Sequence, residues 1–202
     1  RFYNSIRKFD NHRYMSWEHC HNYFRKLKGE KLSKQEKDLA QLHLAFYLAS
    51  WGMYRGSSFI LQKDYTVFDK IVDIILDKRY LPLWNLEKNY EKELKHLFCE
   101  IYDKLEKELK NIKEEVKKHP DIDKNKRYLS GDNISFTLIT KILLGTIGCI
   151  PAYDRFFMDG LTKDFQKKFN PKKSFKEMLN FYIKNKKDIN RMIKKFKGYK
   201  PM

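Results

Sequence analysis

Hydrophobic residues recur along most of this chain with the three- and four-residue spacing of amphipathic helices. No segment alternates apolar and polar residues in the way that a half-buried strand does. Two stretches, residues 39–54 and 136–144, are apolar on nearly every side, which is typical of helices surrounded by other elements. We expect these to be the two most buried helices. A capping box formed by Ser33 and Glu36 marks the start of the first one.

The other predicted helices are apolar on one side only, so they should pack outside the centre. They cover residues 17–27, 66–76, 87–118 and 152–169, the last either continuous or interrupted at Gly160. A final helix or helix pair begins at a second capping box, Ser174 with Glu177. Residues 117–131 are polar and predict one long loop. The pattern as a whole predicts an all-α fold: a single globular domain of about 7–9 helices with a basic C-terminal helical segment.

Positive charge is concentrated at the C-terminal end. The formal net charge is +17, and residues 163–202 hold fourteen Lys or Arg against three Asp or Glu. We therefore divide the chain into a helical core with an N-terminal arm (1–162) and a basic helical segment packed on the same domain (163–202). Such asymmetry indicates a polyanionic partner, DNA or RNA. Lys184, Lys187 and Lys194 would contact phosphates. The alternative is a solvated, lysine-rich terminal helix.

Several classes of protein are disfavoured by the composition. No apolar run is long enough for a membrane span, so no membrane partner is expected. The three cysteines lie far apart in apolar contexts, as reduced core cysteines of a cytoplasmic protein do. Residues 19–21 read His-Cys-His, but consecutive residues of a helix point in different directions and cannot share one ion. The sequence indicates no metal site and no cofactor.

The most apolar part of the chain carries the candidate chemistry. Residues 137–157 contain Lys141 within a buried helix, Gly145 and Gly148 in the turn that follows, and Asp154 near the start of another helix. Burial would lower the pKa of Lys141 and favour a neutral, nucleophilic amine. The dipole at a helix N-terminus would favour the ionised form of Asp154.

This order of residues resembles the helix-hairpin-helix DNA glycosylases. The resemblance covers residues 137–157 and implies that Lys141 attacks the sugar carbon of a flipped nucleotide. It further implies that Asp154 activates the lysine and stabilises the positive charge that develops. The backbone amides of the turn containing Gly145 and Gly148 would hold a DNA phosphate. The function expected from this resemblance is a nucleic-acid-binding protein with glycosylase or lyase-like activity.

Other interpretations remain open for the same residues. In a purely structural one, Lys141 either extends its ammonium group toward the surface or pairs with Asp154, Asp154 caps a helix, and the glycines permit close helix packing. Arg55 and the amides of residues 56–58 would bind a phosphate or simply end a helix. Two other functions also fit the sequence: a non-catalytic helical protein-interaction module, or a small-molecule enzyme with a pocket near His43, Arg55 and Asp154.

Overall fold

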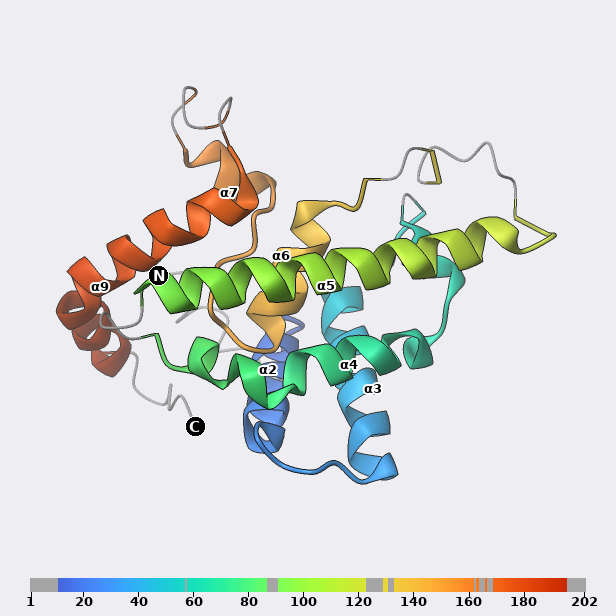
Figure 1. The fold of residues 1–202 in the computed structure, drawn as a ribbon, viewed down its shortest axis with the longest axis horizontal. Helices are drawn as coiled ribbons and strands as arrows, with labels where there is room; N and C mark the ends of the chain where they lie inside the picture. Colours follow the sequence, from blue (N-terminus) through green and yellow to red (C-terminus); the bar gives the residue numbers. More distant parts are fainter. Residues whose placement is uncertain are drawn as a thin grey trace.

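A computed structural model describes residues 11–56, 58–86, 91–122, 129–130, 133–161, 163, 166 and 169–195, with the backbone alone at 91 and 192–195. Every regular element in these residues is helical, which confirms the all-α fold expected from the hydrophobic spacing (Figure 1). The predicted N-terminal arm lies largely outside the described residues, and so does part of the predicted loop at 117–131. No helix in the described part of the chain has both the length and the apolar character needed to cross a bilayer.

The regular elements of the described residues are α-helices and 3-10 helices. The α-helices are α2 (Met15–Leu27), α3 (Lys34–Ser50), α4 (Asp69–Leu76), α5 (Glu91–Lys118), α6 (Phe136–Gly145), α7 (Arg155–Asp159) and α9 (Pro171–Lys195). Three 3-10 helices lie between α3 and α5: η1 (Phe59–Gln62), η2 (Tyr65–Phe68) and η3 (Lys78–Trp84).

The long helix α5 crosses the whole molecule, and the other elements are arranged around it (Figure 1). It contacts α4, η3, η1, α6 and α9. Helices α2, α3 and α6 contact one another, and in Figure 1 they run across the direction of α5. Helix α9 lies at one end, beside the N-terminal half of α5. The core is therefore the space between α5 and the group formed by α2, α3 and α6.

The sequence of α5 explains its position. Its apolar residues recur on one side, and Leu94, Phe98, Ile101, Leu105 and Leu109 are all buried. Lysines and glutamates occupy the opposite side, where they form ion pairs such as Lys104 with Glu100. A helix with one apolar stripe buries that stripe and leaves its charged face in water. The predicted one-sided packing of this helix is confirmed.

Helix α6 is buried on nearly every side, as its sequence predicts. Leu138 is 4% exposed, and Ile139, Ile142 and Leu143 are completely buried. Two hydrogen bonds attach α6 to the segment before α7: the hydroxyl of Thr137 donates to the Tyr153 carbonyl, and the Tyr153 N–H donates to the hydroxyl of Thr140. These bonds place the residue after Tyr153, which is Asp154, beside the middle of α6.

Helix α3 differs from its prediction because one face has no neighbour in the described chain. Its capping box is present, and Leu44 and Leu48 are completely buried. Leu39, Leu42 and Phe46, however, are 38%, 46% and 60% exposed. Helix α3 contacts α2, η2, α4 and α6, and these leave its outer side open. An apolar residue on every side of a helix therefore did not mean burial on every side.

The start of α9 differs from prediction, whereas the end of α7 agrees with the alternative in which Gly160 interrupts the helix. Helix α9 begins at Pro171, because the side chain of Asn170 accepts hydrogen bonds from the N–H groups of Lys172 and Lys173. Ser174 is not a cap; its hydroxyl forms hydrogen bonds with the Pro171 carbonyl, within the first turn, and with the Tyr153 hydroxyl. Within the described part of the predicted helix at 152–169, α7 is a short helix that ends at Asp159 and is capped by Gly160.

Candidate functional site

Lys141 lies inside the protein on α6, with its ammonium group against the end of α3. The side chain is 6% exposed. Its Nζ donates a hydrogen bond of 2.8 Å to the carbonyl oxygen of Trp51, the residue that ends α3, and lies 6.0 Å from the centroid of the Trp51 ring. The exposed end of a helix has carbonyl groups without helical partners, and a cation is favourable there. Lys141 thus joins α6 to the C-terminus of α3.

The surroundings of Lys141 favour its neutral form. Burial lowers the pKa of the Lys141 ammonium; the Asp154 carboxylate acts in the opposite direction, and the Arg55 guanidinium adds to the lowering. Asp154 and Arg55 are thus both close enough to act on this amine electrostatically. A lysine with a lowered pKa has a larger neutral fraction, and neutral amines are the nucleophilic form. The structure therefore brings together three of the residues singled out from the sequence.

Asp154 is the N-terminal cap of α7. Its Oδ1 accepts a hydrogen bond of 3.1 Å from the N–H of Phe157. This capping role was one of the structural alternatives. The ion pair between Lys141 and Asp154 that belonged to the same alternative is not formed, since the described hydrogen bond of the amine goes to Trp51. One carboxylate oxygen of Asp154 is thus used for capping, while its charge still reaches Lys141.

The two glycines after Lys141 make room for neighbouring rings. A Cβ on Gly145 would lie 2.2 Å from Cε1 of Tyr47, and a Cβ on Gly148 would lie 2.9 Å from Cε1 of His21. Gly148 also has a φ of +74°, a backbone conformation that favours glycine. The N–H groups of Thr146 and Gly148 donate to carbonyl oxygens of α6. The turn therefore offers fewer free amides to a phosphate than the sequence predicts.

Two aromatic residues of α3 belong to this region, and the sequence did not single them out. Tyr47 is completely buried, and its hydroxyl has no hydrogen-bond partner among the residues that the structure describes. The indole N–H of Trp51 is buried without a partner as well. Burial raises the pKa of the Tyr47 phenol, and the nearby Cys20 and the Asp154 carboxylate raise it further. Buried polar atoms are usually paired. The two unpaired polar atoms of Tyr47 and Trp51 therefore distinguish the region around Lys141 from ordinary core.

Arg55 is exposed and lines a small cavity of 150 Å³ near the start of α6. Ser58, Ser135 and Lys113 line the same cavity. Lys113 is 3% exposed and donates to the carbonyl of Ser130. The N–H of Ser58 donates to the Arg55 carbonyl at 2.8 Å, so this amide of the predicted phosphate-binding turn is already used. Arg55 remains a candidate contact for an anion through its guanidinium.

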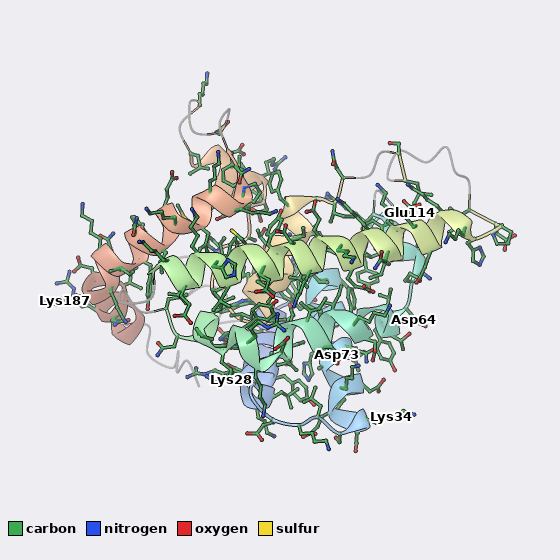
Figure 2. The ribbon with its side chains drawn as sticks, viewed as in Figure 1. Lys28, Lys34, Asp64, Asp73, Glu114 and Lys187 are labelled. Atoms are coloured by element: carbon green, nitrogen blue, oxygen red, sulfur yellow. The ribbon has the colours of Figure 1, made fainter. Side chains whose placement is uncertain are left out.

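Exposed basic side chains form a row along α9, which we call the α9 basic face. Its members are separated by three, four or eight residues, which places them on one side of the helix. They are Lys173, Lys176, Lys184, Lys187 and Arg191. Figure 2 shows Lys187 on the outer side of the helix. Lys184 and Lys187, both predicted phosphate contacts, are thus exposed on this face. The side chain of Lys194, the third predicted contact on this segment, lies outside the described residues.

His43 lies apart from the other candidates. It is half-buried and stacks on Tyr23 of α2, with ring centroids 4.3 Å apart. Burial lowers its pKa, and the nearby His19 adds to the effect. Neither His43 nor Asp154 is among the described residues that line the three described cavities, whereas Arg55 is. The predicted small-molecule pocket that would combine these three residues has no counterpart in those cavities.

The described residues thus present two separate features: a buried amine with Asp154 and Arg55 nearby, and the α9 basic face. No protein-family model matches the chain, and comparisons with curated proteins and with solved structures find no match either.

Proposed function

We propose that this protein binds nucleic acid and that the α9 basic face is the principal contact. The single observation that carries the proposal is the exposure of five basic side chains on one side of one helix. Lys173, Lys184 and Lys187 have no acidic partner among the described residues. Basic side chains that are not neutralised within the protein are available for phosphate groups. The helical spacing of these residues places them on one side, whereas basic residues at other spacings would point in several directions.

The dimensions of the face suit an extended polyanion. From Lys173 to Arg191 the helix rises by roughly 27 Å at 1.5 Å per residue. Duplex DNA carries one negative charge for about every 1.7 Å of its axis, so several phosphates lie within reach of such a row. Arg191 is paired with Asp188 at 2.9 Å, which makes its guanidinium less available to a phosphate than an unpaired side chain. The lysines therefore supply most of the expected affinity.

The proposal is tested by the salt dependence of binding. Lys173, Lys176, Lys184 and Lys187 would be replaced together by Gln, and affinity for a duplex and for a single strand would be measured at several salt concentrations. The log–log slope should become shallower by about 0.9 for each duplex phosphate that the variant no longer neutralises. The matched control replaces four exposed lysines elsewhere by Gln: Lys31, Lys34, Lys78 and Lys107. Equal effects of the two sets would show that only net charge matters and would contradict a footprint on α9.

A second candidate function is amine chemistry at Lys141, and the lowered pKa of this lysine beside Asp154 favours it. The neutral amine would add to the aldehyde carbon of an abasic sugar and lose water to give an imine. Borohydride reduces such an imine to a stable covalent adduct. This chemistry agrees with the resemblance of residues 137–157 to the helix-hairpin-helix glycosylases. It also requires that the sugar reach an amine that is 6% exposed.

Borohydride trapping on abasic DNA tests this second candidate. Wild-type protein should form an adduct, Lys141→Gln should not, and Asp154→Asn should form it more slowly. Lys141→Gln also loses the 2.8 Å bond to the Trp51 carbonyl, so a urea denaturation curve for each variant must accompany the trapping. Absence of an adduct with the folded wild-type protein would leave Lys141 as a structural link between α6 and α3.

A further inference from the structure

A second, apolar cavity lies next to α9 on the side away from its basic face. Its volume is 580 Å³, and its walls come from η3 and the residues after it, from the turn between α6 and α7, and from α9. Representative lining residues are Trp84, Leu144, Ile150, Leu179, Phe181 and Tyr182. Among the described residues, no charged side chain lines it. We call it the α9 groove.

The α9 groove has a buried floor and an exposed aromatic residue at its mouth. Ile150 and Leu179 are each 2% exposed, and Ile147 is 3% exposed. Phe181 lines the same groove and is 61% exposed. Along α9 the groove extends from Met178 to Ile189, which is roughly 16 Å at 1.5 Å per residue. Its shape is therefore long as well as apolar.

Two lysines flank the groove from different elements. Nζ of Lys28 lies 5.8 Å from the ring centroid of Trp84, and Nζ of Lys186 lies 5.8 Å from the ring centroid of Tyr182. Both aromatic residues line the groove, so each ammonium group is held near its rim by a cation–π contact. The interior is thus apolar while the rim is positively charged.

We propose that the α9 groove binds a long-chain anionic amphiphile of the fatty-acid type as a single molecule. The hydrocarbon chain lies along the groove, and the carboxylate lies at the rim, within the field of Lys28 and Lys186. The volume falls within the range of about 300–1,000 Å³ that is typical of small-molecule sites. A helix of a partner protein would need a larger contact, since stable protein interfaces bury about 1,200 Å² or more. The site is independent of the nucleic-acid proposal, because none of the lysines of the α9 basic face lines it.

Calorimetric titration of the full chain with hexadecanoate, kept below its micelle-forming concentration, tests the proposal. One molecule should bind per chain, with a negative heat-capacity change from apolar burial. Each methylene group removed from the chain should weaken binding about fourfold. Binding should also change the fluorescence of Trp84, and this change should disappear in Trp84→Phe.

Matched variants locate the site. Phe181→Ala should weaken binding about tenfold, whereas Phe156→Ala should not, because Phe156 is 77% exposed but does not line the groove. Replacing Lys28 and Lys186 together by Gln should reduce the affinity for hexadecanoate toward that for hexadecanol. Lys184→Gln, which removes a charge from the other face, should leave the difference between acid and alcohol unchanged.

Three results would overturn the proposal. The first is absence of hexadecanoate binding, and the second is equal affinity for octanoate and hexadecanoate, which would indicate attraction by charge alone. The third is tight binding of an acidic amphipathic helical peptide that Phe181→Ala weakens while hexadecanoate fails to compete. That outcome would identify the groove as a site for a partner helix. Loss of nucleic-acid binding in the α9 basic-face variant would not change any of these results.

Discussion

At Gly145, helix α6 passes the ring of Tyr47 with no space for a side chain. A Cβ would lie 2.2 Å from Cε1 of that ring, and Tyr47 is completely buried, so the ring cannot move outward. Gly145→Ala should therefore lower the free energy of unfolding by roughly 1–3 kcal/mol, despite the better helix propensity of alanine. Urea denaturation measures the change. Gly56→Ala is the control, because nothing lies within 4 Å of its Cβ position. Equal losses of stability in the two variants would show that the Tyr47 ring moves aside.

His21 should make stability depend on pH. Burial lowers the pKa of His21. Its Nδ1–H donates a hydrogen bond of 2.7 Å to the Thr146 carbonyl, which offsets part of this lowering, and the positive charges of Arg25 and Lys28 lower the pKa further. In the unfolded chain a histidine binds a proton near pH 6.5, whereas folded His21 binds it only at lower pH. Between these two values the unfolded chain holds more protons, so the free energy of unfolding should fall as the pH is lowered.

The variant His21→Asn tests this assignment, because asparagine can still donate to the Thr146 carbonyl but does not titrate. Urea denaturation at a series of values from about pH 7.5 to pH 5 should show a shallower loss of stability in His21→Asn than in the wild type. The pKa of His43 is lowered as well, so part of the slope should remain. An identical slope in wild type and variant would mean that His21 binds its proton at the same pH in the folded and the unfolded chain.

Lys141 illustrates what residue type and position predict and what they leave out. The apolar run around it predicted a buried amine with a lowered pKa, and both features are present. Its hydrogen-bond partner, the carbonyl of Trp51, lies 90 residues earlier in the chain. Backbone carbonyls are the same at every position, so no sequence pattern identifies this partner. The packing of α3 against α6 determines it.

At the scale of elements, helix α3 shows that an apolar residue in a helix is not always buried. Phe46 is 60% exposed while Leu44, two residues earlier, is completely buried. Phe46→Ser should therefore change the free energy of unfolding by only about 0.5 kcal/mol, whereas Leu44→Ala should lower it by about 2–5 kcal/mol. Thermal and urea denaturation measure both. A large loss of stability in Phe46→Ser would mean that this face is covered in solution, as it would be in a self-associated form, and sedimentation analysis would then show that state.

The helices themselves were largely predictable, but their ends were less so. One-sided apolar spacing located α5, and the capping box located the start of α3. The same Ser-x-x-Glu pattern at Ser174 predicted the wrong start for α9, because Asn170 caps the helix one turn earlier. Both residues are good caps, and the choice depends on tertiary contacts: the hydroxyl of Ser174 instead contacts that of Tyr153. Local pattern thus predicts an element better than it predicts where the element begins.

Across the whole molecule, α9 combines an apolar side that belongs to the core with a basic side that faces water. Phe175 is 1% exposed and stacks on Phe98 of α5, with ring centroids 4.0 Å apart. Lys172, on the same helix, pairs with Asp103 of α5. The basic segment is therefore attached to the body by packing as well as by charge, and removing its lysines should alter binding without detaching the helix.

The same packing predicts that α9 unfolds together with the rest of the protein. In a Trp84→Phe background, which removes the tryptophan that lines the α9 groove, the fluorescence of Trp17 and Trp51 reports on the body, while circular dichroism reports on all helices. The two signals should give one coincident thermal transition, as expected for a single cooperative domain. Phe175→Ala should lower both midpoints together, because it removes a buried aromatic side chain at a cost of about 3–5 kcal/mol. If α9 were an independent appendage, Phe175→Ala would instead produce an early loss of helical signal with no change in fluorescence.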